Sequence, residues 1–445
     1  MIVMKFGGTS VADAAAMTRS IGIVEGKLKQ KPIVVVSACA KVTDSLYGIL
    51  ELVAAGKKEE ALKITEGLKQ RHLTTAEELG AGEEGAAVVL ARTSWMTDFI
   101  EKHSGSPVSD MDKAHFISMG EYMSSGIMCH GMNARGIKTT WIDARRMVIT
   151  DSEHMCGTPD MEKLAVATKA VIDAEYKDVD AVITQGFISS TADGEPSILG
   201  RGGSDYSASL IGASVDAARI EIWTDVDGVR TADPRIVENT VGISKLSYEE
   251  AAELAYLGAK VLHPLTMEPA VPKSIPLFVL NSMNPSSEGT AVMSKSCIFD
   301  GVKSISYKEN IKVISIYSMK MIDTPGFMMK VFSVFANDGV SVDLISSSEA
   351  SITVTVDKNQ VIDKVVADLS AFATVRVNDD KSQISLVGKN IIGVRGLLSK
   401  TFGALVDHKI YMISQGATYL NLSVVVDRPE LRTALCRLHK AFFEN

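Results

Sequence analysis

The sequence is poor in cysteine and has no paired cysteine motif. Its five cysteines are scattered over 445 residues, and no two of them form a CxxC pair. An odd, widely spaced set fits neither a disulfide framework nor a zinc site. We therefore expect reduced thiols in a cytoplasmic protein at Cys39, Cys129, Cys156, Cys297 and Cys436.

Long apolar runs and an excess of positive charge are also missing. No apolar stretch approaches the ~18 residues of a membrane span, and Lys5 with the glycines after it leaves no room for the apolar core of a signal peptide. Lys and Arg number 46 against 54 Asp and Glu, a formal charge of −8. An acidic chain does not offer the broad basic surface that nucleic acid or anionic lipid requires. We expect neither nucleic acid nor a membrane as a partner.

The first two thirds of the chain alternate short apolar runs with helical patterns. Such runs are typical of strands buried on both faces. They lie at 33–36, 181–187, 220–224 and 276–281. A helix is expected to begin at 158–160, where Thr158 offers an N-cap, Pro159 the first helical position and Asp160 an acid in the first turn. The Ala-, Glu- and Lys-rich stretch 54–97 predicts a helical insert. This alternation predicts an α/β fold with a mostly parallel central sheet sandwiched by helices.

The last third contains an internal repeat with a period of 70 residues. Ile314–Asp357, moved by 70 positions, lies without a gap on Ile384–Asp427 and pairs Gly326 with Gly396. Each copy has the pattern strand, glycine turn, helix, strand, strand. Two copies are too few for a solenoid but fit a pair of small modules packed side by side. The alternative is a chance similarity between two such patterns.

The first glycine cluster follows a predicted strand near the N-terminus. In VMKFGGTS, Lys5 precedes Gly7 and Gly8. Paired glycines let backbone N–H groups face a phosphate at close range, and the lysine adds a positive charge beside it. A P-loop has its lysine after the glycines. On spacing alone, this segment fits a phosphate loop and a turn with a solvated lysine equally well.

The second glycine cluster, LGRGGSDYS at 199–207, contains Arg201 and Asp205. Arginine can hold a carboxylate through two parallel hydrogen bonds, and the glycines expose backbone to an anion. The alternative is a flexible hairpin, for which Asp193-Gly194 is the better candidate. We favour an anion site.

A third segment, WTDVDGVRTADPR at 223–235, follows the apolar run at 220–224 and places Thr224 and Asp225 where ligands bind in open α/β sheets. Its aspartates lack the glycine and glutamate of an EF-hand, which argues against a metal cage.

The chain has no HExxH, GxSxG or protein-kinase signature, and lone His263 is expected to be structural. Anion loops without a nucleophile and base favour group transfer by positioning and charge stabilisation. A carboxylate acceptor, already ionised at neutral pH, would need no general base.

Six ordered motifs resemble those of aspartate kinases, over essentially the whole chain. They are KFGGTSV (5–11), SACAKVTDSL (37–46), SMGEYMSS (118–125), GRGGSDYSA (200–208), WTDVDGVRTADPR (223–235) and GAKVLHP (258–264). The repeated tail resembles the paired ACT modules of that family's monofunctional, lysine-sensitive members. The resemblance implies an amino-acid-kinase domain at 1–297 and ferredoxin-like ACT modules at 298–380 and 381–445.

The resemblance also implies an activity and its residues. ATP, carrying Mg²⁺, would donate its γ-phosphoryl group to the β-carboxylate of L-aspartate. Arg201 would hold the substrate α-carboxylate, Glu121 its ammonium group, and Asp205 would organise the phosphate-binding lysines. The matching catalytic positions are Lys5, Gly7, Gly8, Asp205 and Lys260. The substrate positions are Ser37, Thr43, Glu121, Arg201 and Ser204. The nucleotide positions are Lys5, Phe6, Gly7, Gly8, Thr224, Asp225, Arg230, Arg235, Lys260 and Val261.

For the tail, the resemblance implies L-lysine as effector and a homodimer, or a dimer of dimers, joined through the ACT modules. The effector positions are Met321, Thr324, Phe327, Met328, Ser341, Val342, Asp343, Ser348 and Glu349. The residues leave threonine open as an effector. The chain departs from the family at Arg230, where many relatives have tyrosine, and at Lys41, where glycine is usual. The alternatives are a non-catalytic sensor of amino acid and ATP, or another carboxylate kinase of this fold, which would usually lack the tail.

Overall fold

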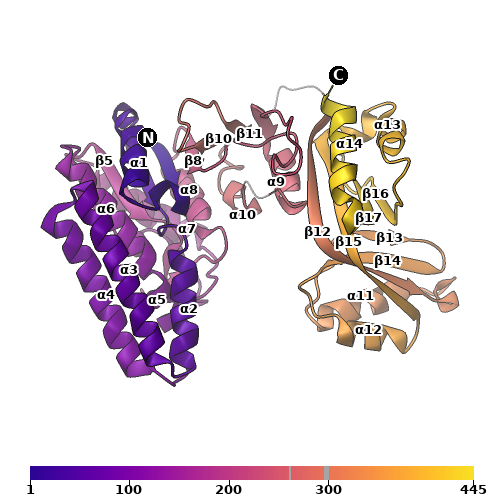
Figure 1. Cartoon of the computed structure of the whole chain (residues 1–445), viewed down its shortest axis with the longest axis horizontal. Coiled ribbons are helices and arrows are strands. Elements are labelled where there is room, and N and C mark those ends of the chain that lie inside the picture. Colours follow the sequence, from indigo (N-terminus) through magenta and orange to yellow (C-terminus); the bar gives the residue numbers. More distant parts are fainter. Residues whose placement is uncertain (260–261, 295–299, 445) are drawn as a thin grey trace. The chain divides into compact units, whose positions relative to one another are not determined.

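The computed structural model describes residues 1–259, 262–294 and 300–444, and the chain forms two compact units, each with its own large sheet (Figure 1). The first unit comprises Met1–Val229, Ser244–Tyr248 and Val261–Ser296. The second comprises Arg230–Ile243, Glu249–Lys260 and Cys297–Asn445. The boundary predicted at 297/298 lies outside the described residues.

The first unit is built on an eight-stranded sheet with the order β3-β5-β2-β1-β8-β10-β11-β9. Its strands are β1 Ile2–Phe6, β2 Pro32–Val36, β3 Thr139–Ile142, β5 Ala181–Gln185, β8 Ile220–Thr224, β9 Lys245–Ser247, β10 Leu277–Asn281 and β11 Thr290–Met293. All neighbouring pairs are parallel except β10 and β11. The central strands β1, β2 and β5 are buried along their whole length, as the apolar runs predict.

Helices cover this sheet, and a small sheet lies beside it. The helices are α1 Ala14–Glu25, α2 Val42–Ala54, α3 Lys58–Leu79, α4 Gly82–His103, α5 Asp110–Ile117, α6 Met119–Ala134, α7 Met161–Glu175, α8 Gly203–Ser214 and α10 Pro264–Met267. The small sheet has the order β4-β6-β7, from Ile149–Thr150, Ile188–Thr191 and Pro196–Ile198. The predicted helical insert is confirmed as α3 and α4, which run side by side in Figure 1. Across the part of the chain that is described, no helix has both the length and the apolar character for crossing a bilayer.

The start of α7 differs from the prediction. Thr158 was expected to cap this helix, but Asp160 is the N-cap and accepts a hydrogen bond from the Lys163 amide at 3.1 Å. The reason is that Thr158 is already held by Asp151, whose carboxylate accepts from the Thr158 amide at 3.0 Å and whose amide donates to the Thr158 carbonyl. The proline therefore stands before the helix rather than in its first turn.

The second unit contains one six-stranded antiparallel sheet that both repeats share, in the order β13-β14-β12-β15-β17-β16. Its strands are β12 Gly301–Tyr317, β13 Ile345–Ser347, β14 Ser351–Asp357, β15 Thr374–Lys389, β16 Met412–Gln415 and β17 Asn421–Asp427. Its helices are α9 Tyr248–Tyr256, α11 Phe327–Asn337, α12 Asp363–Ser370, α13 Leu397–Ala404 and α14 Leu431–Phe443. The paired glycines serve the same purpose in both copies, because Gly326 (φ +85°) and Gly396 (φ +77°) are the left-handed N-caps of α11 and α13. The fold class predicted from the sequence is confirmed.

Segments from the middle of the chain belong to this second unit. Ala232 and Val237 pack in the hydrophobic cluster of the second repeat. On α9, Glu250 forms a fully buried ion pair with Lys303 of β12, at 2.6 Å. The residues that precede the predicted catalytic Lys260 are thus bound to the sheet of the repeats.

Candidate active site

The parallel strands bring several loops to one edge of the sheet. The carboxyl ends of β1, β2 and β8 lie side by side in register, at Phe6, Val36 and Trp223. Beyond this edge the Gly7 amide donates to the Trp223 carbonyl at 3.0 Å, and the Ser37 amide donates to the Phe6 carbonyl at 3.1 Å. The glycine loop and the Ser37 loop therefore start from fixed positions, at the edge where ligands bind in such sheets.

Lys5 and Asp205 meet at this edge. The Lys5 Nζ atom lies 2.6 Å from Asp205 Oδ1, and both side chains are largely buried. Asp205 is in the first turn of α8, which begins after Gly202 in the left-handed conformation (φ +73°). A Cβ atom on Gly7 would lie 3.4 Å from Lys5 Nζ, so the glycine backbone closely approaches the ammonium group. The two predicted catalytic side chains and the glycine loop form one cradle, in which the Lys5 ammonium group is paired with the Asp205 carboxylate.

The glycine loop and the Ser37–Thr43 loop interlock. A Cβ atom on Gly8 would lie 2.9 Å from the Ala38 carbonyl oxygen, so a side chain at position 8 would force these loops apart. The Ala40 amide donates to the Gly8 carbonyl at 3.0 Å. Beyond this loop Thr43 stands half-buried in the first turn of α2.

Ser10 anchors the far end of the glycine loop and was not predicted. Its buried hydroxyl lies 2.7 Å from the Ser282 hydroxyl and 3.3 Å from the Trp223 carbonyl. Ser282 in turn donates its amide to the Thr224 carbonyl. The glycine loop is thereby tied to the ends of β8 and β10. The sequence motif contains Ser10, but nothing in it indicates a partner 272 positions away.

Glu121, on α6, is a buried carboxylate beside the Ser37 loop. It is 3% exposed, and its Oε2 atom has no hydrogen-bond partner among the described residues. Burial raises its pKa to about 8, although hydrogen bonds from the backbone at Ala38 and Glu121 oppose the shift. Three residues further along the helix, Ser124 donates to the Ser37 carbonyl at 2.7 Å, and this bond holds α6 against the Ser37 loop. A carboxylate with a raised pKa and a free oxygen is suited to receive a cationic group.

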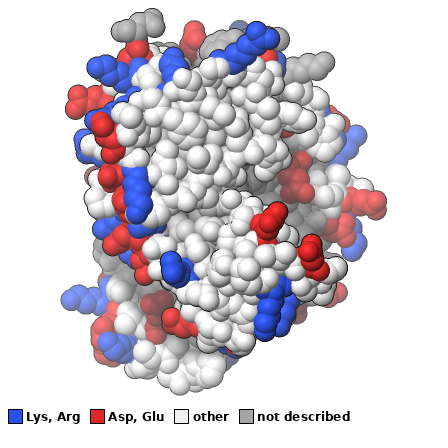
Figure 2. All heavy atoms as spheres, turned by 90° about the vertical axis from the view of Figure 1, so that its right-hand side faces the viewer, with Lys and Arg blue, Asp and Glu red and all other residues white. Residues whose placement is uncertain are grey.

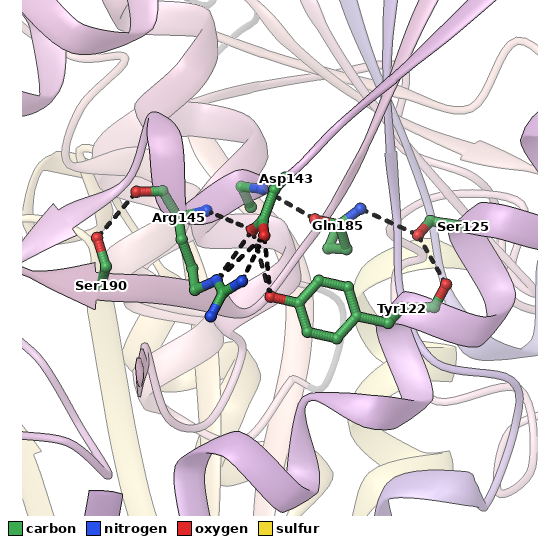
Figure 3. Close-up of polar contacts among 7 residues, drawn as sticks. Tyr122, Ser125, Asp143, Arg145, Gln185 and Ser190 are labelled. Atoms are coloured by element: carbon green, nitrogen blue, oxygen red, sulfur yellow. Dashed lines mark hydrogen bonds and ion pairs between the residues drawn. The ribbon is translucent and has the colours of Figure 1, made fainter. Parts of the chain in front are cut away.

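A polar network holds α6 from the other side (Figure 3). Tyr122 donates to Asp143, which also forms a bidentate ion pair with Arg145. Gln185, at the end of β5, accepts from the Ala144 amide at 2.8 Å and donates to Ser125 at 3.1 Å. Ser125 donates to the Glu121 carbonyl at 2.6 Å. The backbone of Glu121 is therefore fixed relative to the sheet, and no sequence pattern indicates this support.

The remaining predicted residues of the first unit lie on loops, in the first turn of a helix or at the end of a strand. Arg201 is exposed, in the glycine-rich turn before α8, and Ser204 is in the first turn of that helix. Thr224 is the last residue of β8 and Asp225 follows it, with a hydrogen bond of 3.2 Å between their side chains. His263 caps α10 and lies against Gly202, where a Cβ atom would come within 2.9 Å of the histidine Cβ. This arrangement agrees with a structural role for His263.

The structure does not place four of the predicted nucleotide contacts relative to this edge. Arg230 and Arg235 belong to the second unit, where Arg230 donates to Thr240 at 2.7 Å and Arg235 pairs with Asp233 at 2.6 Å. Lys260 and Val261 lie outside the described residues.

The predicted effector residues lie in the first repeat, on both sides of α11. Met321, Phe327 and Val342 pack into one hydrophobic cluster. Asp343 accepts a hydrogen bond from Lys308 at 3.0 Å, with both side chains largely buried. Exposed members of the set are Thr324, Met328, Ser341, Ser348 and Glu349.

Comparisons with known proteins agree with this architecture. A family model described as the amino acid kinase family matches residues 1–281, and an ACT domain model matches 314–370 and 384–442. The two ACT matches start 70 residues apart, which confirms the repeat. Lysine-sensitive aspartokinase 3 of Escherichia coli is 32% identical over 100% of this chain and 99% of its own length. Its solved structure with aspartate and ADP has a TM-score of 0.88, and that with lysine and aspartate 0.81, each covering both chains completely.

A parallel sheet with a lysine and glycine cradle at its carboxyl edge, followed by two ACT modules on a shared sheet, defines an amino acid kinase with a regulatory tail. The full-length similarity narrows this class. The chain belongs to the aspartokinase family, and the resemblance found in its sequence motifs is confirmed.

Proposed function

We propose that the protein transfers the γ-phosphoryl group of ATP to the β-carboxylate of L-aspartate, giving 4-phospho-L-aspartate, in the cytoplasm and under feedback inhibition by lysine. The observation that carries this proposal is the Lys5–Asp205 pair against the Gly7–Gly8 loop, in a chain similar over its full length to an aspartokinase solved with aspartate and ADP.

Lys5 and the glycine amides supply the phosphate half of the site. Lys5 is buried beside Gly7, so its charge acts with little screening on the transferred group. Asp205 keeps the ammonium group in place, and Lys260 adds a second positive charge. Thr224, Asp225, Arg230, Arg235, Val261 and the Phe6 backbone contact the nucleotide.

The aspartate half uses the neighbouring loops. Arg201 holds the α-carboxylate, Glu121 the ammonium group, and Ser37, Thr43 and Ser204 line the pocket. Because the β-carboxylate is ionised at neutral pH, no base is required and catalysis rests on positioning and charge stabilisation.

Mg²⁺ would be carried into the site on ATP and would neutralise phosphate charge there. Among the described residues, no group of three His, Cys, Asp or Glu side chains is placed to hold a metal ion, and Asp205 is engaged by Lys5. These residues fit an ion held mainly by phosphate oxygens and water, as is usual for Mg²⁺ in kinases.

The raised pKa of Glu121 predicts proton release when aspartate binds. At pH 7 a carboxyl group with a pKa of about 8 is mostly protonated, and it has to ionise to pair with the substrate ammonium group. Calorimetry at pH 7, in two buffers of different ionisation enthalpy, is expected to show release of close to one proton per aspartate bound. The release is expected to disappear at pH 9 and in Glu121→Gln. No release from the wild type at pH 7 would contradict this assignment.

For regulation, we infer that lysine binds about Asp343. In the structure Asp343 already holds an ammonium group, that of Lys308, which also lies 5.0 Å from the centre of the Tyr256 ring on α9. An effector ammonium group that replaces Lys308 changes the surroundings of Tyr256, four residues before Lys260. Lysine would thus make different contacts in two states of the enzyme, and this difference lets it favour one of them.

We also propose a homodimer, or a dimer of dimers, through the ACT modules. The face of the second unit that Figure 2 turns to the viewer carries few charged side chains over a broad area. Several apolar side chains of this unit are exposed, among them Met329 (72%), Tyr419 (71%), Ile345 and Ile413. Exposed apolar area of this kind is typical of an interaction surface.

A sensor that binds aspartate and ATP without turnover is the competing function. The two are separated by following ADP formation with L-aspartate and Mg-ATP, with L-glutamate as the control acceptor. Aspartate-dependent ADP formation is expected, with little from glutamate. Binding of both ligands without ADP would favour the sensor.

A further inference from the structure

Arg71 lies in the helical insert, outside every motif of the site, yet its side chain reaches two site loops. From α3 its guanidinium group donates to the Ala12 carbonyl at 2.9 Å and to the Ala40 carbonyl at 3.0 Å. Ala12 follows the turn that continues the glycine loop, and Ala40 lies within the Ser37–Thr43 loop. One side chain therefore bridges the phosphate and aspartate halves of the site.

The loop that Arg71 holds contains an unfavourable backbone conformation. Lys41 has φ +67°, in the left-handed region that favours glycine, and it immediately precedes α2. Ala40, next to it, is fixed from both sides, because its amide donates to Gly8 and its carbonyl accepts from Arg71. External bonds of this kind are what keep a non-glycine residue in such a conformation.

The guanidinium group is chemically suited to this position. Its NH1 group binds one carbonyl and its NH2 group the other, so a single rigid plane sets the distance between the two loops. A lysine ammonium group at this position is a point charge without that fixed geometry. The glycine loop has further anchors at Ser10 and Trp223, whereas Arg71 acts on the aspartate loop directly at Ala40.

We propose that Arg71 is a positioning residue that holds the aspartate loop, with its left-handed Lys41, in the conformation that binds L-aspartate. It touches neither substrate and acts through the Ala40 carbonyl. The proposal rests on the proposed function, since it assigns a role in binding that same substrate.

The test compares Arg71→Ala and Arg71→Lys with Lys63→Ala, which removes an exposed positive charge from the same helix. For Arg71→Ala we expect kcat/KM for aspartate to fall about tenfold or more, mainly through KM, because a small displacement of binding groups is costly. KM for Mg-ATP should change much less, since the glycine loop keeps its other anchors. Arg71→Lys should recover part of the loss, and Lys63→Ala should behave as the wild type.

The thermal unfolding temperature of each variant shows whether a kinetic change comes from lost stability or from a displaced loop. If Arg71→Ala does not fold, Arg71→Lys and Arg71→Gln are compared with Lys63→Ala instead. Equal kinetics for Arg71→Ala and Lys63→Ala, or an equal rise of both KM values, would overturn the proposal. Calorimetric binding of aspartate tests it independently of turnover. A wild type without product but with aspartate binding weakened by Arg71→Ala would leave the role of Arg71 supported and the proposed reaction refuted.

Discussion

Replacing Lys5 by methionine is expected to lower kcat about a thousandfold, the upper range for removal of one group that stabilises transition-state charge. Lys5 is 8% exposed and its ammonium group lies beside the backbone of Gly7, so water cannot take over its role. The measurement is steady-state formation of the phosphorylated product at saturating aspartate and Mg-ATP. Lys29→Met, which removes an exposed lysine, is the matched control.

Loss of Lys5 also leaves the Asp205 carboxylate without its ion-pair partner, at a site where the pair is 2.6 Å apart. An unpaired, largely buried charge is itself destabilising. The double variant Lys5→Met/Asp205→Asn removes that charge and is expected to recover the unfolding temperature without recovering kcat. A Lys5→Met enzyme within tenfold of the wild-type kcat would refute the catalytic role of Lys5.

Replacing Asp343 by asparagine is expected to raise the lysine concentration for half-inhibition by at least ~30-fold, the effect of losing one buried charge partner. The carboxylate is largely buried and already bound to an ammonium group, that of Lys308. The measurement is a lysine inhibition curve, normalised to the activity of each variant without lysine. Asp363→Asn, which changes an exposed aspartate in the first turn of α12, is the matched control.

Lys308→Met is expected to change the lysine concentration for half-inhibition in the opposite direction. If the Lys308 ammonium group competes with the effector for Asp343, its removal is expected to lower the lysine concentration for half-inhibition. Direct binding of lysine by calorimetry should follow the same order as inhibition. Loss of inhibition in both variants would show that the ion pair stabilises the repeat and that Lys308 does not compete with lysine.

The parts that sequence predicts well are those in which the chemistry is local. A buried strand is a run of apolar residues, so β1, β2 and β8 follow from short segments. The cradle around Lys5 does not, because the segment around Lys5 alone fits a phosphate loop and a simple turn equally well, and Asp205 lies far away in the sequence. The repeat also follows directly from the sequence. The structure agrees with it, because Gly326 and Gly396 both have a positive φ and both stand immediately before a helix.

The parts that sequence misses depend on contacts between distant segments. The hydrogen bond from Arg71 to Ala40 joins residues 31 positions apart, and that from Ala144 to Gln185 joins residues 41 apart. Neither segment carries a pattern that indicates its partner. The start of α7 was misplaced for the same reason, because the contact of Thr158 with Asp151 decides it.

The most direct test of the central claim is trapping of the product with hydroxylamine, which captures an acyl phosphate as a hydroxamate. With L-aspartate and Mg-ATP the protein is expected to form aspartyl hydroxamate, and lysine is expected to inhibit it. The same assay with threonine, alone and with lysine, identifies which of the two amino acids inhibits the enzyme. Absence of hydroxamate at saturating substrates would contradict the proposed reaction, and formation that neither amino acid affects would contradict the proposed regulation.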